Sequence, residues 1–101
     1  MIRSLKINYL STAERDLIEI FKYIMQDNPT AAASLLEEID RSISHLSDNP
    51  ELCVVPNDDR LKRLGYRILI IRKYLVFYVL KEESVQIRRV LHGARKYACL
   101  L

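Results

Sequence analysis

The chain has 101 residues, half of them hydrophobic and only five of them Gly or Pro, so its composition indicates one folded domain, residues 1–101, and excludes a disordered chain. No apolar run approaches the roughly 20 residues of a membrane helix, and the first residues lack the pattern of a secretory signal. Residues 1–57 hold nine acidic and five basic residues, whereas residues 58–101 hold four acidic and eleven basic ones. We therefore expect a cytoplasmic domain with no membrane partner, whose basic C-terminal half faces an acidic or polyanionic partner.

The two cysteines, Cys53 and Cys99, are too few for a disulfide framework and lack the spacing of a zinc site. We expect two free thiols, with no metal and no cofactor. The sequence also contains no glycine-rich phosphate loop and no nucleophile–base motif, so nothing in it favours an enzyme acting on small molecules.

A short strand is predicted over residues 3–9, where Leu5, Ile7 and Tyr9 alternate with polar residues. Residues 11–14, Ser-Thr-Ala-Glu, have the capping-box pattern, which predicts that a helix begins there. Apolar residues then recur at helical spacing and define one face of this helix: Leu17, Ile20, Phe21 and Ile24.

A second helix is predicted from Pro29, because proline is favoured at the first helical position and Asn28 is a good cap before it. This helix ends near residues 47–50. The connection between the two helices is short, so they form an antiparallel hairpin. The apolar stripe of the second helix consists of Ala32, Leu35, Leu36, Ile39, Ile43 and Leu46.

Residues 50–65 contain Pro, Asn, Asp and Gly and are predicted to form a loop, with residues 52–55 tucked under a sheet edge. Three apolar runs follow at residues 68–71, 75–80 and 85–91. The breaks between them are too short for crossover helices, so the three strands form an antiparallel meander. Gly93 ends the last strand, and residues 94–101 form a tail in which Leu100 and Leu101 pack back onto the domain.

The predicted fold is α+β with the order β-α-α-β-β-β, in which the helical hairpin covers one face of an antiparallel sheet and the second face is free to bind. The place of the first strand in the sheet stays open, because it depends on the path of the hairpin. In the last strand Arg89 breaks the alternation, which indicates either a bulge near it or a snorkelling arginine, whose apolar stem lies along the sheet while its charged head reaches solvent. We expect one side of this strand to carry Val85, Ile87 and Leu91, and the other side to carry Arg88, Val90 and His92.

Four phrases carry a resemblance to a known family: ERDLIEIFKYI, HLSDNPEL, GYRILIIRKYLVFYV and VQIRRVLHGARKY. In this order they resemble the RelE/ParE superfamily, the toxins of bacterial toxin–antitoxin modules, over nearly the whole chain. The resemblance implies a cognate antitoxin as partner, with DNA contacted only indirectly through that antitoxin. It also implies growth arrest and plasmid stabilization by one of two mechanisms.

RelE-like and YoeB-like members cut messenger RNA on the ribosome, which requires an acid–base pair and cations near the reacting phosphate. The candidates for this chemistry are Arg67 and Arg95 as phosphate clamps, His92 for proton transfer, and Tyr97 for base stacking or proton donation. Each of them also has a structural interpretation, as a solvated, hydrogen-bonded or packed residue.

ParE-like members inhibit DNA gyrase instead, without a known catalytic constellation. RelE-like nucleases carry a phosphate-contacting arginine in a Tyr/His-Arg-apolar-apolar-Tyr phrase, where this chain has Leu75, and two lysines where it has Arg67 and Leu69. These departures favour a ParE-like gyrase inhibitor over the ribosome-dependent nuclease, and a non-toxic binding module is the third alternative. The candidate target-binding residues are Arg67, Arg72, Lys73, Arg88, Arg89, His92, Arg95 and Tyr97.

Overall fold

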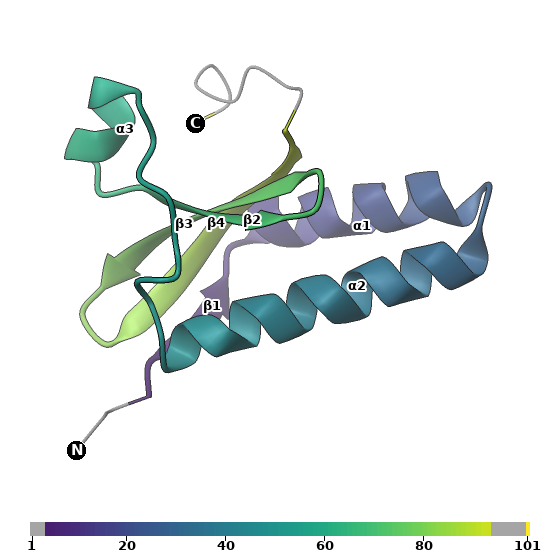
Figure 1. The fold of residues 1–101 in the computed structure, drawn as a ribbon, viewed down its shortest axis with the longest axis horizontal. Helices are drawn as coiled ribbons and strands as arrows, with labels where there is room; N and C mark the ends of the chain where they lie inside the picture. The colour runs from purple at the N-terminus through teal and green to yellow at the C-terminus, as the bar shows by residue number, and fades with distance from the viewer. Residues whose placement is uncertain (1–3, 94–100) are drawn as a thin grey trace.

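The computed structural model describes residues 4–93 and Leu101 (Figure 1). The predicted order of one strand, two helices and three strands is present, with one further short helix before the second strand. The elements are β1 (Lys6–Tyr9), α1 (Ser11–Met25), α2 (Pro29–Ser44), a 3-10 turn η1 (His45–Ser47), α3 (Asp59–Arg63), β2 (Arg67–Ile71), β3 (Tyr74–Lys81) and β4 (Ser84–His92).

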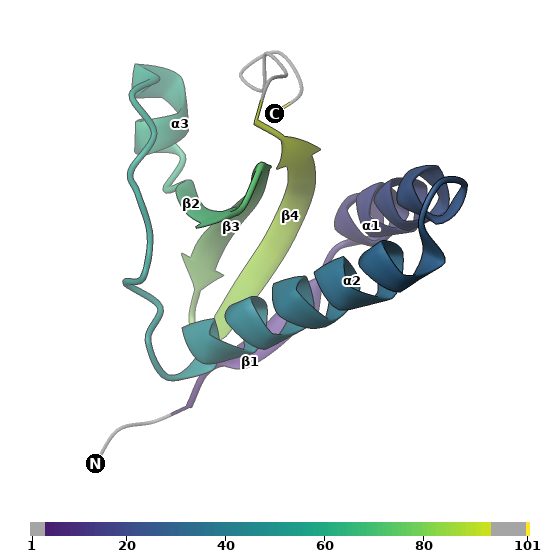
Figure 2. The ribbon, with the colours of Figure 1, turned by 45° about the vertical axis from the view of Figure 1, so that its right-hand side comes forward.

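The four strands form one sheet in the order β1-β4-β3-β2. Strands β2, β3 and β4 form the expected antiparallel meander, whereas β1 lies parallel to β4 at the opposite edge. The α+β class and the element order are confirmed, but the sheet is mixed rather than wholly antiparallel. Figure 2 shows the path of the chain: after β1 it runs through the hairpin of α1 and α2 on one side of the sheet, and it enters the meander at β2, the opposite edge strand.

The two helix starts differ in how they are capped. At α2, the side chain of Asn28 accepts a hydrogen bond from the backbone N–H of Ala31 at 3.1 Å, as the sequence predicts. At α1, the predicted capping box is absent, because Ser11 is already helical and Leu10 occupies the cap position without a side-chain hydrogen bond. The backbone N–H of Leu10 instead donates to the carbonyl of Ile87 at 2.9 Å, so sheet pairing fixes this helix start.

The bulge expected near Arg89 is confirmed. Phe77 on β3 lies opposite Arg89, and its neighbour Tyr78 lies opposite Ile87, so Arg88 is the extra residue on β4. A bulge shifts the alternation of side chains along its strand by one position.

This shift changes which residues of β4 face the hairpin. Val90 is buried in the same cluster as Val85 and Ile87, beneath α1 and α2, whereas Leu91 belongs to a second cluster. The prediction that Leu91 shares a side with Val85 and Ile87 is therefore wrong, because the extra residue at the bulge shifts the alternation of the side chains that follow it.

The main core lies between the hairpin and the sheet. Ile39 and Ile43 on α2 are 1% and 0% exposed, which confirms their predicted burial. Leu17 and Ile20 on α1 are only partly buried, although they pack against the same cluster. The helix α2 thus supplies most of the buried helical surface.

The second face of the sheet is covered rather than free. Helix α3 lies on this face, opposite the hairpin, in the segment that was predicted to be a loop (Figure 2). Leu75 and Leu101 pack against the cluster beneath it, which confirms the predicted contact of Leu101, while Leu100 lies outside the described residues. The second cluster consists of Leu61, Tyr66, Ile68, Phe77, Val79 and Leu91.

Residues 52–55 lie along the β2 edge of the sheet but are not tucked beneath it. Val54 forms an antiparallel bridge with Ile68, with backbone hydrogen bonds of 2.8 and 2.9 Å. Because this pairing lies in the plane of the sheet, the side chains are left in solvent: Leu52, Val54 and Val55 are 52%, 51% and 57% exposed. The prediction that they are covered is wrong, and only Cys53 is partly buried.

Candidate functional site

Arg89, a predicted target-binding residue, is turned toward α1. Its Nε and Nη2 atoms donate to the two carboxylate oxygens of Asp16 at 2.7 and 3.0 Å, and the backbone N–H of Val90 donates to the same carboxylate at 2.9 Å. The hydrogen bond to Asp16 raises the pKa of Arg89. Arg89 therefore joins β4 to α1, which is an anchoring role in the fold.

Arg72 lies in the β2–β3 turn, where its φ angle of 54° is in the left-handed region. Its Nη2 atom is 2.7 Å from Oε1 of Glu38 on α2. Both side chains remain substantially in solvent, so this ion pair is weak by the standards of buried pairs. It nevertheless brings the turn and the hairpin together on one side of the sheet.

Arg88, the bulge residue, lies on the second face beside α3. Its guanidinium carbon is 5.6 Å from the centre of the Tyr66 ring, and its Nη2 donates to Oε1 of Gln86 at 3.2 Å. Its Nε is buried without a hydrogen-bond partner in the described part of the chain. This cation–π contact with Tyr66 stabilises the charge of Arg88 within the domain.

Arg67 begins β2 and faces the segment after α2. Its Nη1 lies 3.9 Å from Sγ of Cys53, which is a free thiol as expected; Cys99 lies outside the described residues. The neighbouring Tyr78 donates a 2.7 Å hydrogen bond to the carbonyl of Pro50, and burial raises its pKa.

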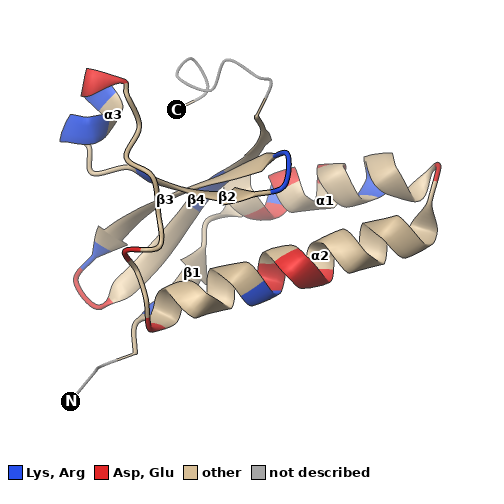
Figure 3. Ribbon diagram, viewed as in Figure 1, with Lys and Arg blue, Asp and Glu red and all other residues tan. Residues whose placement is uncertain are grey.

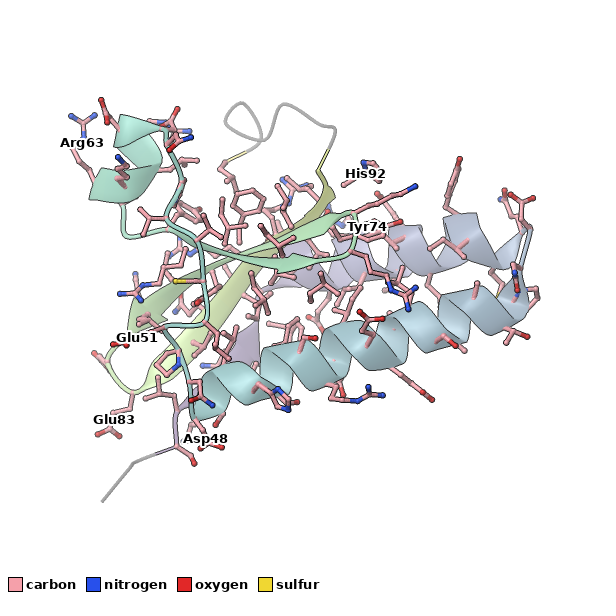
Figure 4. All side chains as sticks on the ribbon, viewed as in Figure 1. Asp48, Glu51, Arg63, Tyr74, Glu83 and His92 are labelled. Atoms are coloured by element: carbon pink, nitrogen blue, oxygen red, sulfur yellow. The ribbon has the colours of Figure 1, made fainter. Side chains whose placement is uncertain are left out.

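His92 and Lys73 meet where β4 ends against the β2–β3 turn. The His92 ring makes an edge-on contact with Tyr74, with 5.5 Å between ring centres, and the backbone N–H of Gly93 donates to the Lys73 carbonyl at 2.7 Å. Figure 4 shows the His92 and Tyr74 side chains together at this end of the sheet. With Glu19, Ile20 and Tyr23 of α1 they line an open hollow of about 550 Å³.

The candidate nuclease residues are not brought into one site by the described part of the chain. Arg67 lies opposite Tyr78 and His92 opposite Tyr74, so about 13 Å of β3 separates them at 3.3 Å per residue. The other two candidates, Arg95 and Tyr97, lie outside the described residues. A proton-transfer group and a phosphate clamp must both reach one phosphate, which Arg67 and His92 cannot do at this separation.

Leu75, at the position of the phosphate-contacting arginine in RelE-like nucleases, packs against the cluster on the second face. Its Cγ lies near the position that a Cβ would occupy at Gly93, 3.9 Å away. The surroundings of this position are thus apolar. No three His, Cys, Asp or Glu residues within 4–93 and 101 are placed to hold a metal ion.

The sequence interpretation missed a set of cations on α3. Lys62 and Arg63 are exposed, and Figure 3 shows basic residues on α3 and on the β2–β3 turn. Two local signals were present: Asp58 is a good helix cap, and Gly65 is suited to the position just past a helix end. They were hard to recognise because only five residues separate the cap from the C-cap.

Three solved structures with the same fold come from toxin–antitoxin systems. A chain of the chromosomal ParDE system from P. aeruginosa aligns with a TM-score of 0.74 and 17% identity, over 88% of this chain and 96% of that chain. A chain of the RelBE2 complex from Mycobacterium tuberculosis gives 0.64 and 18%, over 94% and 98%. A chain of the E. coli DinJ-YafQ complex gives 0.58 and 14%, over 100% and 99%.

The fold is therefore that of the RelE/ParE superfamily of toxins, as the resemblance implied. A search of curated proteins returned no match. The family model described as "ParE toxin of type II toxin-antitoxin system, parDE" matches residues 7–97, and the chain belongs to this family. None of the helices in the described part is both long and apolar enough to cross a bilayer.

Proposed function

We propose that this chain is the toxin of a type II toxin–antitoxin module and arrests growth by inhibiting DNA gyrase. The observation that carries this proposal is the apolar packing of Leu75 at the position where RelE-like nucleases have a phosphate-contacting arginine. A leucine cannot stabilise the charge that develops on a phosphate during cleavage. The family match over residues 7–97 agrees with a ParE-like rather than a RelE-like mechanism.

One observation favours the alternative, a ribosome-dependent messenger RNA endonuclease. His92 is exposed beside Tyr74 and Lys73, so a proton-transfer group and a cation share one hollow. General acid–base groups contribute roughly 100-fold to 10,000-fold to a reaction rate. If the chain is a nuclease, His92→Ala should therefore lower the rate of messenger RNA cleavage by that factor. If the chain is a gyrase inhibitor, the same variant should lose only part of its inhibition of gyrase.

We also propose a cognate antitoxin as partner, because the structural relatives come from toxin–antitoxin complexes. A partly disordered antitoxin can fold on binding and cover a large surface. We expect it to place an acidic or apolar segment against the basic face of the sheet and residues 65–97. The adjacent reading frame is the candidate. Its co-expression should restore growth and the two proteins should co-purify, whereas failure to associate at low salt would exclude this partner.

Induced expression in bacteria tests the mechanism. A gyrase inhibitor should block DNA replication and cause DNA damage while messenger RNA stays intact. A nuclease should instead cut messenger RNA within translated codons. Unaltered growth, with neither effect, would leave the non-toxic binding module as the remaining interpretation.

A further inference from the structure

The cations of the basic half differ in whether the domain already engages them. Arg72 is paired with Glu38, Arg89 with Asp16, and Arg88 stacks on Tyr66, as described above. By contrast, Lys62 and Arg63 on α3 make no ion pair or side-chain hydrogen bond with any described residue. Lys73 and Lys81, at the turns of the meander, are likewise exposed and without such a partner among the described residues, but α3 carries two of these cations at adjacent positions.

Helix α3 is held in a fixed conformation despite its five residues. The side chain of Asp58 caps its start by accepting from the N–H of Leu61 at 3.0 Å. At its end, Gly65 has a φ of +82°, and the N–H groups of Gly65 and Tyr66 donate to the carbonyls of Lys62 and Leu61, both at 3.0 Å. This pair of hydrogen bonds is the Schellman motif, which satisfies the last carbonyls of a helix.

Helix α3 is also anchored to the second face of the sheet. Leu61 is 0% exposed and packs with Tyr66 in the second cluster, which adds the apolar contact that accompanies a Schellman motif. Arg60, on the same helix, donates from Nη1 to the carbonyl of Leu101 at 3.5 Å. Lys62 and Arg63 are thus presented on a preorganised support, so a partner orders only their side chains on binding.

We propose that α3 is a docking element for an acidic protein surface, which, if the proposed function holds, belongs to DNA gyrase. Charge complementarity identifies this occupant: α3 carries three basic residues and one acidic residue. The inference rests on the proposed gyrase target and adds the surface that recognises it. This surface is separate from the hollow at His92, which lies at the end of β4.

The composition of α3 favours a protein over a nucleic acid as its occupant. Leu64, directly after the helix, is 56% exposed beside the two cations, and protein interfaces combine apolar contact with arginine. Asp58 and Asp59 lie at the start of α3, before Lys62 and Arg63, so the cationic part of this surface is the C-terminal end of the helix, next to Leu64. An acidic protein surface with an apolar centre matches both features.

The test is inhibition of gyrase supercoiling by the purified chain and by Lys62→Glu/Arg63→Glu. We expect the reversed charges to raise the concentration needed for half-inhibition about tenfold or more, the effect of losing one strong interface contact. The matched control is Arg15→Glu/Lys22→Glu, which makes the same charge change at two exposed positions on α1 and should retain inhibition. Thermal melting confirms that both variants are folded.

A charge-conserving variant, Lys62→Arg/Arg63→Lys, should inhibit as the unaltered chain does. The inference is overturned if Lys62→Glu/Arg63→Glu inhibits normally while the unaltered chain inhibits gyrase, and the proposed function then stands. If the unaltered chain does not inhibit gyrase, the function and the inference both fail. If the unaltered chain binds bare duplex DNA and Lys62→Glu/Arg63→Glu does not, α3 binds a nucleic acid, and the proposal that its partner is a protein is overturned.

Discussion

The carboxylate of Asp16 on α1 accepts two hydrogen bonds from the guanidinium of Arg89 on β4, at 2.7 and 3.0 Å, across 73 residues of sequence. Asp16 is only 8% exposed, and it also accepts the backbone N–H of Val90 just past the bulge. The carboxylate of Asp16 thus pairs with the charge of Arg89 and accepts a backbone hydrogen bond at the point where the bulge interrupts the pairing of β3 and β4. This contact fixes α1 against the sheet, and it gives the partly buried Arg89 side chain a charged partner.

Asp16→Ala should lower the free energy of unfolding by about 3 kcal/mol, because removal of one partner of a buried ion pair leaves the other charge unpaired. The matched control is Glu38→Ala, which removes the exposed ion pair with Arg72 and should cost less than about 1 kcal/mol. Urea denaturation measures both. Equal costs for the two variants would contradict the anchoring role of Asp16.

Ile39→Ala should cost about 2–5 kcal/mol of unfolding free energy, because Ile39 is 1% exposed in the main core. Ile18, on the outer side of α1, is 54% exposed, and Ile18→Ala should cost less than about 0.5 kcal/mol. Chemical denaturation of the two variants provides the comparison. A cost below about 0.5 kcal/mol for Ile39→Ala would mean that α2 does not cover the sheet in solution.

Stability should fall in alkaline solution partly because of Tyr9. Burial, together with the nearby carboxylate of Asp40, raises the pKa of Tyr9 from 10.0 to about 12. The unfolded chain therefore releases this proton at lower pH than the folded domain does, so the unfolding free energy falls as the pH rises between these two values. Below pH 10 the contribution of Tyr9 is fully present.

Tyr9→Phe should flatten this decline when urea denaturation is repeated across the same pH range. It should not abolish the decline, because burial also raises the pKa of Tyr78. Asp40→Asn removes the second cause of the shift and should flatten the decline by a smaller amount. A slope in Tyr9→Phe as steep as in the unaltered chain would show that this side chain is not buried in solution.

The parts of the fold that could be predicted are those fixed by local chemistry. The boundary between the two helices follows from Asn28 and Pro29, and the antiparallel meander follows from the short breaks between apolar runs. The place of β1 and the side of Leu91 could not be predicted, because they depend on the path of the hairpin and on the bulge at Arg88. The path of the hairpin is a tertiary property, and the break in alternation at Arg89 indicated a bulge without showing which residue is the extra one.

The candidate site was predictable in composition but not in arrangement. The basic character of residues 58–101 was visible in the sequence, and Leu75 was recognised as a departure from the nuclease pattern. The partners of Arg72 and Arg89 were not, because Glu38 and Asp16 are distant in sequence. Sequence alone therefore could not separate the cations that hold the fold together from those left for a partner.

The most direct test of the gyrase proposal is a supercoiling assay with purified gyrase, run beside primer extension on a translated reporter messenger RNA. We predict inhibited supercoiling and an uncut reporter for the unaltered chain, with only a graded loss of inhibition in His92→Ala. Codon-phased cleavage of the reporter with normal supercoiling would contradict gyrase inhibition, and would identify the chain as a ribosome-dependent endonuclease.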